Sequence, residues 1–484
     1  MSDKIYIFDT TLRDGAQTQG VDFSLDDKEK ISVALDNLGV DYIEGGWPGA
    51  NPTDTEFFNK KHSFKNSILT AFGMTKKSDH SAENDPMISS LINSKANSIC
   101  LFGKSWDFHV DVALGISKEQ NLKNISESAK HIINSGKEFM FDAEHFFDGY
   151  KSNKEYALNC IKSAYDQGAR WIVLCDTNGG TLPHEVSKIV TDVVKHIPGK
   201  NLGIHAHNDT ENAVANSLVA IQAGVRQVQG TINGLGERCG NANLMSLIPS
   251  LYLKHEFSNN YEIKMNEENI RHLTQCSRLL DEILNRKPNK HLPYVGAAAF
   301  SHKGGMHVSA VQKDPKTYEH IDPKEVGNTR NIVVSDQAGQ SNILSRLETI
   351  GIDIKKNDPK IKQLLEEVKG REFIGYSYDG ADASFELLAR RIVGEIPRYL
   401  IIKAYDVSVK KNSSGEIISS AKAELEVDGE TIVCEGEGNG PVNALDNAIR
   451  NNIRKISKYS DYLKDLRLVD YKVRILNTGT EAVT

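Results

Sequence analysis

Residues 9–17 read Asp9-Thr10-Thr11-Leu12-Arg13-Asp14-Gly15-Ala16-Gln17 and follow a strand-like apolar run, Ile5-Tyr6-Ile7-Phe8. Strands buried inside a parallel sheet are nearly all apolar, so a polar cluster directly after one indicates a site. Asp14 offers an oxygen ligand for a divalent metal, and Arg13 can clamp a carboxylate bidentately. The alternative is a structural Arg13–Asp14 ion pair in a turn or at the floor of a barrel. These nine residues alone do not separate the two.

Length and composition describe a globular protein of more than one domain. The chain has 484 residues, 39% of them hydrophobic and 25% charged, and a formal charge of −7. The length predicts two or three domains, and the negative charge argues against a general nucleic-acid-binding surface. No apolar run approaches the ~18–20 residues that span a bilayer, and Met1-Ser2-Asp3-Lys4 leads directly into a strand without a secretory signal.

The six cysteines are scattered and form no CxxC pair. This pattern is typical of reduced thiols in a cytosol, and it does not suggest a disulfide framework or a zinc site. We therefore expect a cytoplasmic protein with no membrane or nucleic-acid partner.

Short β-rich runs alternate with amphipathic segments from residue 5 to about 250. The segment Leu25–Leu38 places Ile31, Leu35 and Leu38 at helical spacing, with Ser24 as its N-cap. Helices are also predicted over 156–167, 183–196 and 210–223. The predicted strands are Ile5–Phe8, Tyr42–Gly45, Ser67–Phe72, Ser98–Phe102, Glu138–Ala143, Trp171–Cys175, Leu202–His205 and Gln227–Ile232. Eight such alternations predict an α/β fold, a (β/α)8 TIM barrel; a doubly wound sheet is the alternative, but no GxGxxG follows the first strand.

The pattern changes after the barrel. One or two helices are predicted over 266–285, a Gly-, His- and Pro-rich stretch over 290–330, and helix over 340–369. From about residue 372 the chain reads as strand-like, with strands at 398–409, 421–427 and 430–436 and a helix at 442–456. We therefore predict a catalytic barrel at 1–265, a helical linker and lid subdomain at 266–369, and a C-terminal α+β domain at 370–484.

Polar residues follow the predicted barrel strands, where the active site of such a barrel lies. The strongest signal is His205-x-His207, because residues i and i+2 of a strand face the same side. Two neutral imidazoles and a carboxylate form a facial set for a divalent ion. Asp14 supplies the carboxylate, and Asn241 adds a carbonyl oxygen. Nitrogen and oxygen ligands without thiolate permit Mg²⁺, Mn²⁺ or Zn²⁺.

Such a site suits carbon–carbon bond chemistry at an activated ketone. The metal would polarise the keto group of a 2-oxo acid, and Arg13 would stabilise the alkoxide that develops on attack. Thr177 would hold the substrate carboxylate. Glu44 and Glu144 are candidates for general acid–base catalysis, or for orienting Arg13 and metal-bound water.

These motifs resemble the α-isopropylmalate/homocitrate synthase family of metal-dependent Claisen-condensing enzymes. The first signature is Leu12-Arg13-Asp14-Gly15-x-Gln17 with Lys28 eleven residues later; the others are His205-x-His207-Asn208-Asp209 and Gly236-Glu237-Arg238-x-Gly240-Asn241. Glu211 stands where the second signature usually has glycine. The resemblance covers essentially the full chain.

Within the family, stretches 42–49, 102–109 and 141–150 look most like the branch that condenses acetyl-CoA with pyruvate and hydrolyses the thioester. Trp47, Phe146, Phe147 and Tyr150 would narrow a pocket and favour the methyl group of pyruvate, or they are loop packing. The alternatives are a larger 2-oxo acid, as in 2-isopropylmalate or homocitrate synthase, and an acyl-CoA lyase of the same superfamily.

The resemblance also implies roles for the rest of the chain. A histidine and a tyrosine of the lid, best matched by His307 and Tyr318, would enter the neighbouring subunit's active site, with His302 as the less favoured histidine. The C-terminal region, with Gly436-x-Gly438-Asn439-Gly440-Pro441, looks like a regulatory domain that dimerises and binds the end-product amino acid. For the pyruvate-condensing branch that effector is isoleucine, the product of the pathway, and the protein is expected to be a homodimer.

Overall fold

The structure is a computed structural model, and it describes residues 3–302, 305–332, 340, 343–344, 346–348, 350–355, 357–376, 378, 381–397, 399–453, 467–468, 471 and 473. The chain divides into two compact units, Met1–Val334 and Ser335–Thr484. In the described part of the chain, no helix combines the length and the apolar character needed to cross a membrane.

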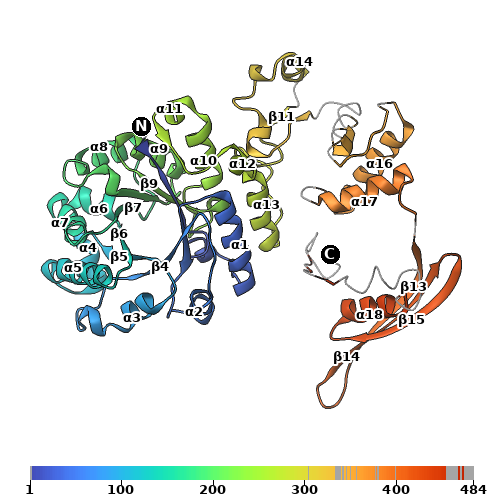
Figure 1. The fold of residues 1–484 in the computed structure, drawn as a ribbon, viewed down its shortest axis with the longest axis horizontal. Coiled ribbons are helices and arrows are strands. Elements are labelled where there is room, and N and C mark those ends of the chain that lie inside the picture. The colour runs from blue at the N-terminus through green and yellow to red at the C-terminus, as the bar shows by residue number, and fades with distance from the viewer. Residues whose placement is uncertain are drawn as a thin grey trace. The chain divides into compact units, whose positions relative to one another are not determined.

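Eight parallel strands close into a barrel in the first unit (Figure 1). They are β2 (Tyr6–Asp9), β3 (Tyr42–Gly46), β4 (Ile68–Met74), β5 (Ser98–Lys104), β6 (Glu138–Glu144), β7 (Trp171–Asp176), β8 (Leu202–Ala206) and β9 (Gln227–Gly230). Each predicted strand is present with ends shifted by at most two residues, and β2 pairs with both β3 and β9. The prediction of a TIM barrel is confirmed.

Helices surround the barrel and bury their apolar side chains against it. The main ones are α1 (Leu25–Leu38), α2 (Pro52–Asn59), α3 (Pro86–Asn93), α5 (Lys118–Asn134), α6 (Phe146–Ser152), α7 (Lys154–Tyr165), α8 (Pro183–Val193), α9 (Ala213–Ala223) and α10 (Leu244–Leu253). α1 begins and ends as predicted, and Ser24 accepts a hydrogen bond from the Asp27 backbone in a capping box. Ile31 and Leu35 of this helix are buried in the layer between barrel and helices.

Two more helices, α12 (Glu267–Arg271) and α13 (Leu273–Ile283), continue this layer beyond the last strand. Leu273 and Leu280 are buried in the same core as the barrel helices. A short parallel pair, β11 (Ser301–His302) with β12 (Asn331–Ile332), then brackets α14 (Gly305–Lys313). The domain boundaries at residues 265 and 370 remain a prediction.

The second unit contains helices and an antiparallel sheet. α16 (Pro359–Phe373) and α17 (Asp382–Val393) share one apolar cluster. The expectation of strand from residue 372 was wrong over α17, because Phe385, Leu388 and Ala389 repeat at helical spacing and are buried. Parts of the predicted 340–369 helix lie outside the described residues.

The C-terminal sheet has the order β13 (Leu400–Lys411), β14 (Ile417–Val427), β15 (Glu430–Gly438). Every second residue of β14, from Ala421 to Val427, is buried against α18 (Pro441–Ile453). This α+β architecture is as predicted; residues 454–456 of the expected helix lie outside the described residues.

Candidate metal centre and active site

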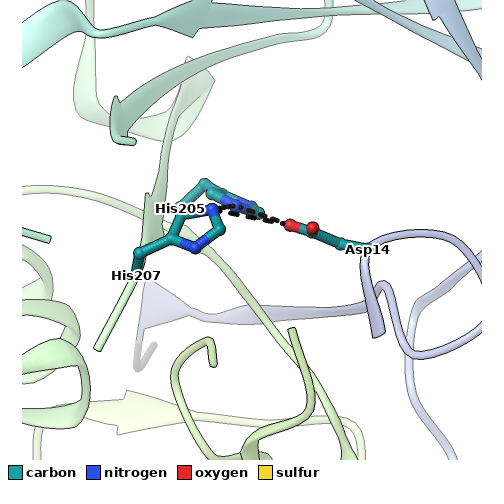
Figure 2. A group of neighbouring side chains, drawn as sticks. All are labelled: Asp14, His205 and His207. Carbon is teal, nitrogen blue, oxygen red and sulfur yellow. Dashed lines mark hydrogen bonds and ion pairs between the residues drawn. The ribbon is translucent and has the colours of Figure 1, made fainter. Parts of the chain in front are cut away.

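Asp14, His205 and His207 meet at the mouth of the barrel, and all three are buried (Figure 2). Asp14 Oδ2 lies 3.1 Å from His205 Nε2 and 3.7 Å from His207 Nε2, and the two Nε2 atoms are 3.2 Å apart. Asp14 comes from the loop after β2, His205 from the end of β8 and His207 from just beyond it. The structure thus brings the three predicted ligands to one point.

Asn241 lies against this group and contacts it through its side-chain amide. Its Nδ2 donates to Asp14 Oδ2 at 2.9 Å, while its Oδ1 is buried with no hydrogen-bond partner. A β-bridge between His207 and Asn241 holds the loop after β9 against the end of β8. A buried acceptor without a hydrogen-bond partner lowers the stability of the fold. A metal ion could satisfy this oxygen.

Two glycines allow the Asn241 loop to close. A Cβ on Gly236 would lie 2.5 Å from Asn241 Oδ1, and a Cβ on Gly240, whose φ is +88°, would lie 2.0 Å from the Gly234 carbonyl. Gly240 therefore excludes a side chain, and a side chain at Gly236 would displace the Asn241 amide. Glu211, at the position where the family signature has glycine, has φ +59°, in the left-handed region that glycine enters most easily.

The electrostatics of the group suit a divalent cation. Burial alone would raise the pKa of Asp14, but Arg13 and the two histidines outweigh it and hold that pKa well below its usual range. Burial and the nearby His205 lower the pKa of His207 to about 3. Burial also opposes protonation of His205, yet Asp14 raises its pKa. Asp14 is thus an anion and His207 a neutral imidazole, the forms that ligate metals.

Arg13 lies next to the triad and is fixed on two sides. Its Nε donates to Glu44 Oε2 at 2.7 Å, and its guanidinium lies 3.7 Å above the centre of the Phe72 ring. Glu44 also accepts from Thr10 Oγ1 at 2.5 Å. Burial raises the pKa of Glu44, and Arg13 opposes that shift. Arg13 reaches to within 3.6 Å of Asp14 Oδ2, so the ion pair and the metal site of the sequence hypotheses coexist.

A buried ion pair beneath this loop carries a role that the sequence did not reveal. Lys28 Nζ donates to the carbonyls of Leu12, at 3.0 Å, and Gly45, at 2.8 Å, and it also bonds Asp54. Asp54 in turn accepts from the Trp47 backbone at 2.8 Å. The pair therefore ties the loop that carries Arg13 to the end of β3 that carries Glu44. A buried lysine is rare, so composition alone would not predict this role for Lys28. The sequence feature that points to it is the fixed spacing between Lys28 and Arg13-Asp14 in the family signature.

The remaining predicted site residues lie on neighbouring strand ends. Glu144, the last residue of β6, forms an ion pair with Lys104 Nζ at 2.5 Å. Thr177 Oγ1 accepts from the His145 backbone at 2.8 Å. Neither side chain hydrogen-bonds to Asp14, His205 or His207 in the described structure, and their catalytic and binding roles remain predictions.

The aromatic residues separate into two groups. Trp47 packs edge-on against Phe72, with ring centres 5.7 Å apart, and Arg13 contacts the same ring. Phe146 and Phe147 are fully buried in the layer between barrel and helices, and the Tyr150 hydroxyl donates to Asp192. The packing alternative therefore applies to Phe146 and Phe147, whereas Trp47 is still a candidate for substrate contact.

In the segment predicted to form a lid, His307 and Tyr318 are neighbours. Their rings stack with centroids 4.1 Å apart, and both side chains are exposed. His302 is engaged elsewhere: its Nε2 lies 3.1 Å from Glu319 Oε1, and Glu319 also binds Arg330 through both carboxylate oxygens. The structure thus pairs the two residues that the sequence matched best and gives His302 a structural contact.

The fold and the site together describe a TIM-barrel protein with a candidate metal-binding cluster at the carboxyl ends of its strands. The barrel matches the HMGL-like family model over residues 4–276, the next segment the homocitrate synthase post-HMGL domain-like model over 294–372, and the last the LeuA allosteric (dimerisation) domain model over 379–484. The chain belongs to the HMGL-like family, as the sequence predicted.

Comparison with individual proteins narrows the assignment. An (R)-citramalate synthase from Aquifex aeolicus is 49% identical over 100% of this chain and 91% of its own length. A probable 2-isopropylmalate synthase from Methanopyrus kandleri is 30% identical over 100% of this chain and 91% of its own length. A solved hydroxymethylglutaryl-CoA lyase from Pseudomonas aeruginosa shares the fold, with a TM-score of 0.50, 16% identity, and 60% of this chain and 96% of that chain covered.

Proposed function

We propose that the chain is an (R)-citramalate synthase, which condenses acetyl-CoA with pyruvate and water to give (R)-citramalate and CoA. The observation that carries this is the buried Asp14–His205–His207 cluster beside Arg13, in a chain 49% identical over its full length to an (R)-citramalate synthase. The lower identity to the 2-isopropylmalate synthase favours pyruvate over a larger 2-oxo acid. An acyl-CoA lyase is less favoured, because the chain carries the LeuA domain beyond the barrel.

The residues present fit a divalent metal. Asp14, His205 and His207 would hold it, and the unpartnered Oδ1 of Asn241 would add a fourth ligand. The absence of a thiolate favours Mg²⁺ or Mn²⁺, with Zn²⁺ as an alternative. Such an ion, when bound, supplies Lewis-acid polarisation of the pyruvate keto group.

The side chains around the metal site would perform the other steps. The acetyl methyl loses a proton, its carbon forms a bond to C2 of pyruvate, and the keto oxygen gains a proton to become a hydroxyl. Arg13, held by Glu44, donates hydrogen bonds to that oxygen as negative charge develops on it. Water then hydrolyses the thioester and releases CoA.

Positioning and proton transfer fall to residues on other strand ends and on the lid. Thr177 binds the pyruvate carboxylate, and Trp47 contacts the methyl group. Glu144, with the His307 and Tyr318 pair of the neighbouring subunit, moves the protons of the acetyl group and of the attacking water. The stacked His307–Tyr318 pair supports a joint role, because one ligand could contact both rings.

Thiol release from acetyl-CoA tests the proposal. After metal is stripped with EDTA, release is measured with pyruvate, 2-oxoisovalerate and 2-oxoglutarate, with Mn²⁺ or Mg²⁺ restored. We expect metal-dependent release with pyruvate above the other two; equal or smaller release with pyruvate would overturn the assignment. His207→Ala should abolish turnover, whereas His184→Ala, which changes an exposed histidine on α8, should not.

We further infer a homodimer that responds to isoleucine, the end product of the pathway that citramalate enters, and that works in the cytoplasm. The LeuA dimerisation domain match supports the dimer and an effector, and the free cysteines support a reducing compartment. A chain ending at Gly394 keeps the α16–α17 cluster and removes the C-terminal sheet. Inhibition by isoleucine should disappear in that truncation; unchanged inhibition would place the effector site elsewhere.

A further inference from the structure

Gln229 links the metal cluster to a buried carboxylate inside the barrel. It lies on β9 with its side chain between His205, on β8, and Asp142, on β6, and all three are buried. Gln229 Oε1 is 2.8 Å from His205 Nδ1, and Gln229 Nε2 is 3.3 Å from Asp142 Oδ1. The sequence suggested no role for Gln229 or Asp142.

The chemistry of the three groups sets the direction of this chain of hydrogen bonds. A carboxylate oxygen accepts hydrogen bonds, and Gln229 Nε2 faces Asp142 Oδ1 at 3.3 Å, so this contact orients the Gln229 NH₂ group toward Asp142. The Gln229 carbonyl oxygen must then face His205, where it can accept a hydrogen bond from Nδ1–H. His205 must be neutral to ligate a metal, and a neutral imidazole carries one proton, so a proton on Nδ1 leaves a lone pair on Nε2.

Nε2 is the atom of His205 that faces Asp14 and His207, at 3.1 and 3.2 Å. An imidazole binds metal through its unprotonated nitrogen, and the hydrogen bond made by the other nitrogen decides which one that is. If the Gln229 amide were turned round, its NH₂ would face Nδ1 and the proton would move to Nε2, where it blocks a metal.

We propose that Gln229 and Asp142 are positioning residues that hold His205 in the Nδ1-protonated tautomer, with Nε2 free and directed at the metal. Asp142 acts through Gln229, and Gln229 acts through His205; neither touches the substrate in this role. Burial raises the pKa of Asp142, and the nearby His205 and Arg13, with hydrogen bonds from Cys100 and Gln229, oppose that shift.

The same strand offers a matched control. Gln227 lies two residues before Gln229, is fully buried and faces Met140, with its Nε2 3.7 Å from the Met140 sulfur. Met140 lies two residues before Asp142 on β6. Gln227 and Met140 therefore form the layer below Gln229 and Asp142 in the barrel interior, without contact to a proposed metal ligand.

The test is the affinity of EDTA-stripped protein for Mn²⁺, measured by the electron paramagnetic resonance of free Mn²⁺. Gln229→Met keeps the size of the side chain and removes its acceptor and donor. We expect its dissociation constant to rise roughly 10- to 100-fold, the usual effect of losing the partner of a metal-ligating histidine. Gln227→Met should bind Mn²⁺ as wild type does. Melting temperatures in EDTA report whether each variant folds.

Asp142→Asn keeps the test decisive if Gln229→Met does not fold. An asparagine can donate as well as accept, so it no longer fixes the Gln229 amide, and we expect a smaller loss of Mn²⁺ affinity than in Gln229→Met. The proposal would be overturned if Gln229→Met and Asp142→Asn, wherever they fold, bound Mn²⁺ with wild-type affinity. It would also be overturned if Gln227→Met lost as much Mn²⁺ affinity as Gln229→Met. The inference rests on the proposed metal site. If the wild-type protein binds no Mn²⁺, the proposed metal site is refuted. If the wild type binds Mn²⁺ and Gln229→Met binds it equally well, only the positioning role of Gln229 and Asp142 is refuted.

Discussion

Replacing Lys28 by methionine should destabilise the barrel and misplace one wall of the active site. Lys28 is 3% exposed, and its ammonium group bonds the carbonyls of Leu12 and Gly45 and the carboxylate of Asp54. Methionine has a similar length but no donor. The substitution therefore leaves two buried carbonyls and one buried carboxylate without the donor they share.

Removal of one partner from a buried, hydrogen-bonded ion pair destabilises a protein by about 3–5 kcal/mol. Asp54 keeps two donors, the Trp47 backbone at 2.8 Å and Asn51 Nδ2 at 2.9 Å, so the lower half of that range is expected. A loss of ~3 kcal/mol corresponds to a fall in melting temperature of roughly 6–12 °C in a large domain. Below that temperature kcat should also fall, because Leu12 and Gly45 adjoin Arg13 and Glu44.

Differential scanning calorimetry at pH 7 measures the melting temperature, and Lys30→Met is the control. Lys30 is on the same helix, 41% exposed, and paired with Asp26 at 2.7 Å; such a pair contributes about 0.3–0.5 kcal/mol. Adding Asp54→Asn to Lys28→Met should restore part of the lost stability by removing the uncompensated charge. A melting temperature for Lys28→Met as high as that for Lys30→Met would refute the reasoning.

Three further changes test other contacts. Arg13→Lys keeps a positive charge but loses the bond from Nε to Glu44, and kcat should fall roughly 10²–10³-fold, with a smaller change in KM; an unchanged kcat would exclude Arg13 as the oxyanion donor. Arg238 holds the pKa of Asp209 below its usual range. The pair therefore stabilises the fold fully above about pH 3.9, the pKa of aspartate in an unfolded chain. This stabilisation is lost as the pH falls through the lower pKa that Asp209 has in the folded protein. Asp209→Asn should therefore lower the urea midpoint at pH 7 but not at the lowest pH where wild type is folded, and an equal gap at both would contradict this. Glu319→Gln disrupts the bidentate bond with Arg330, and hydrogen exchange of residues 318–330 should speed up; unchanged exchange would show that this contact does not hold the lid segment.

The barrel could be predicted because its signals are local. Each strand is a short apolar run, and helix α1 has both its N-cap Ser24 and a C-terminal Gly39 in the left-handed conformation. Helix α17 was not predicted, because the strand-like stretches that follow it led to a prediction of strand for the whole region from residue 372. Its Phe385, Leu388 and Ala389 are buried in the apolar cluster that it shares with α16.

That Asp14, His205 and His207 meet could be predicted because strand ends lie at one face of a barrel, whatever the details of packing. The residues that hold these ligands could not. Lys28 and Gln229 look like ordinary polar residues of a helix and a strand, and their burial follows from the closed barrel. Phe146 and Phe147 face the helices instead of the mouth because His145, with φ +56°, turns the chain sharply after β6.

The bridge between His207 and Asn241 lies beside the seam where β9 meets β2 and the barrel closes. Asp14 is on one side of that seam, near the start of the chain, and the other proposed ligands follow about 190 to 230 residues later. A chain emerging from the ribosome therefore lacks a complete ligand set until the last barrel strand has been made. An ion bound there would join the loop after the first barrel strand to the segments that follow the last two, so metal loading would report that synthesis and closure of the barrel are complete.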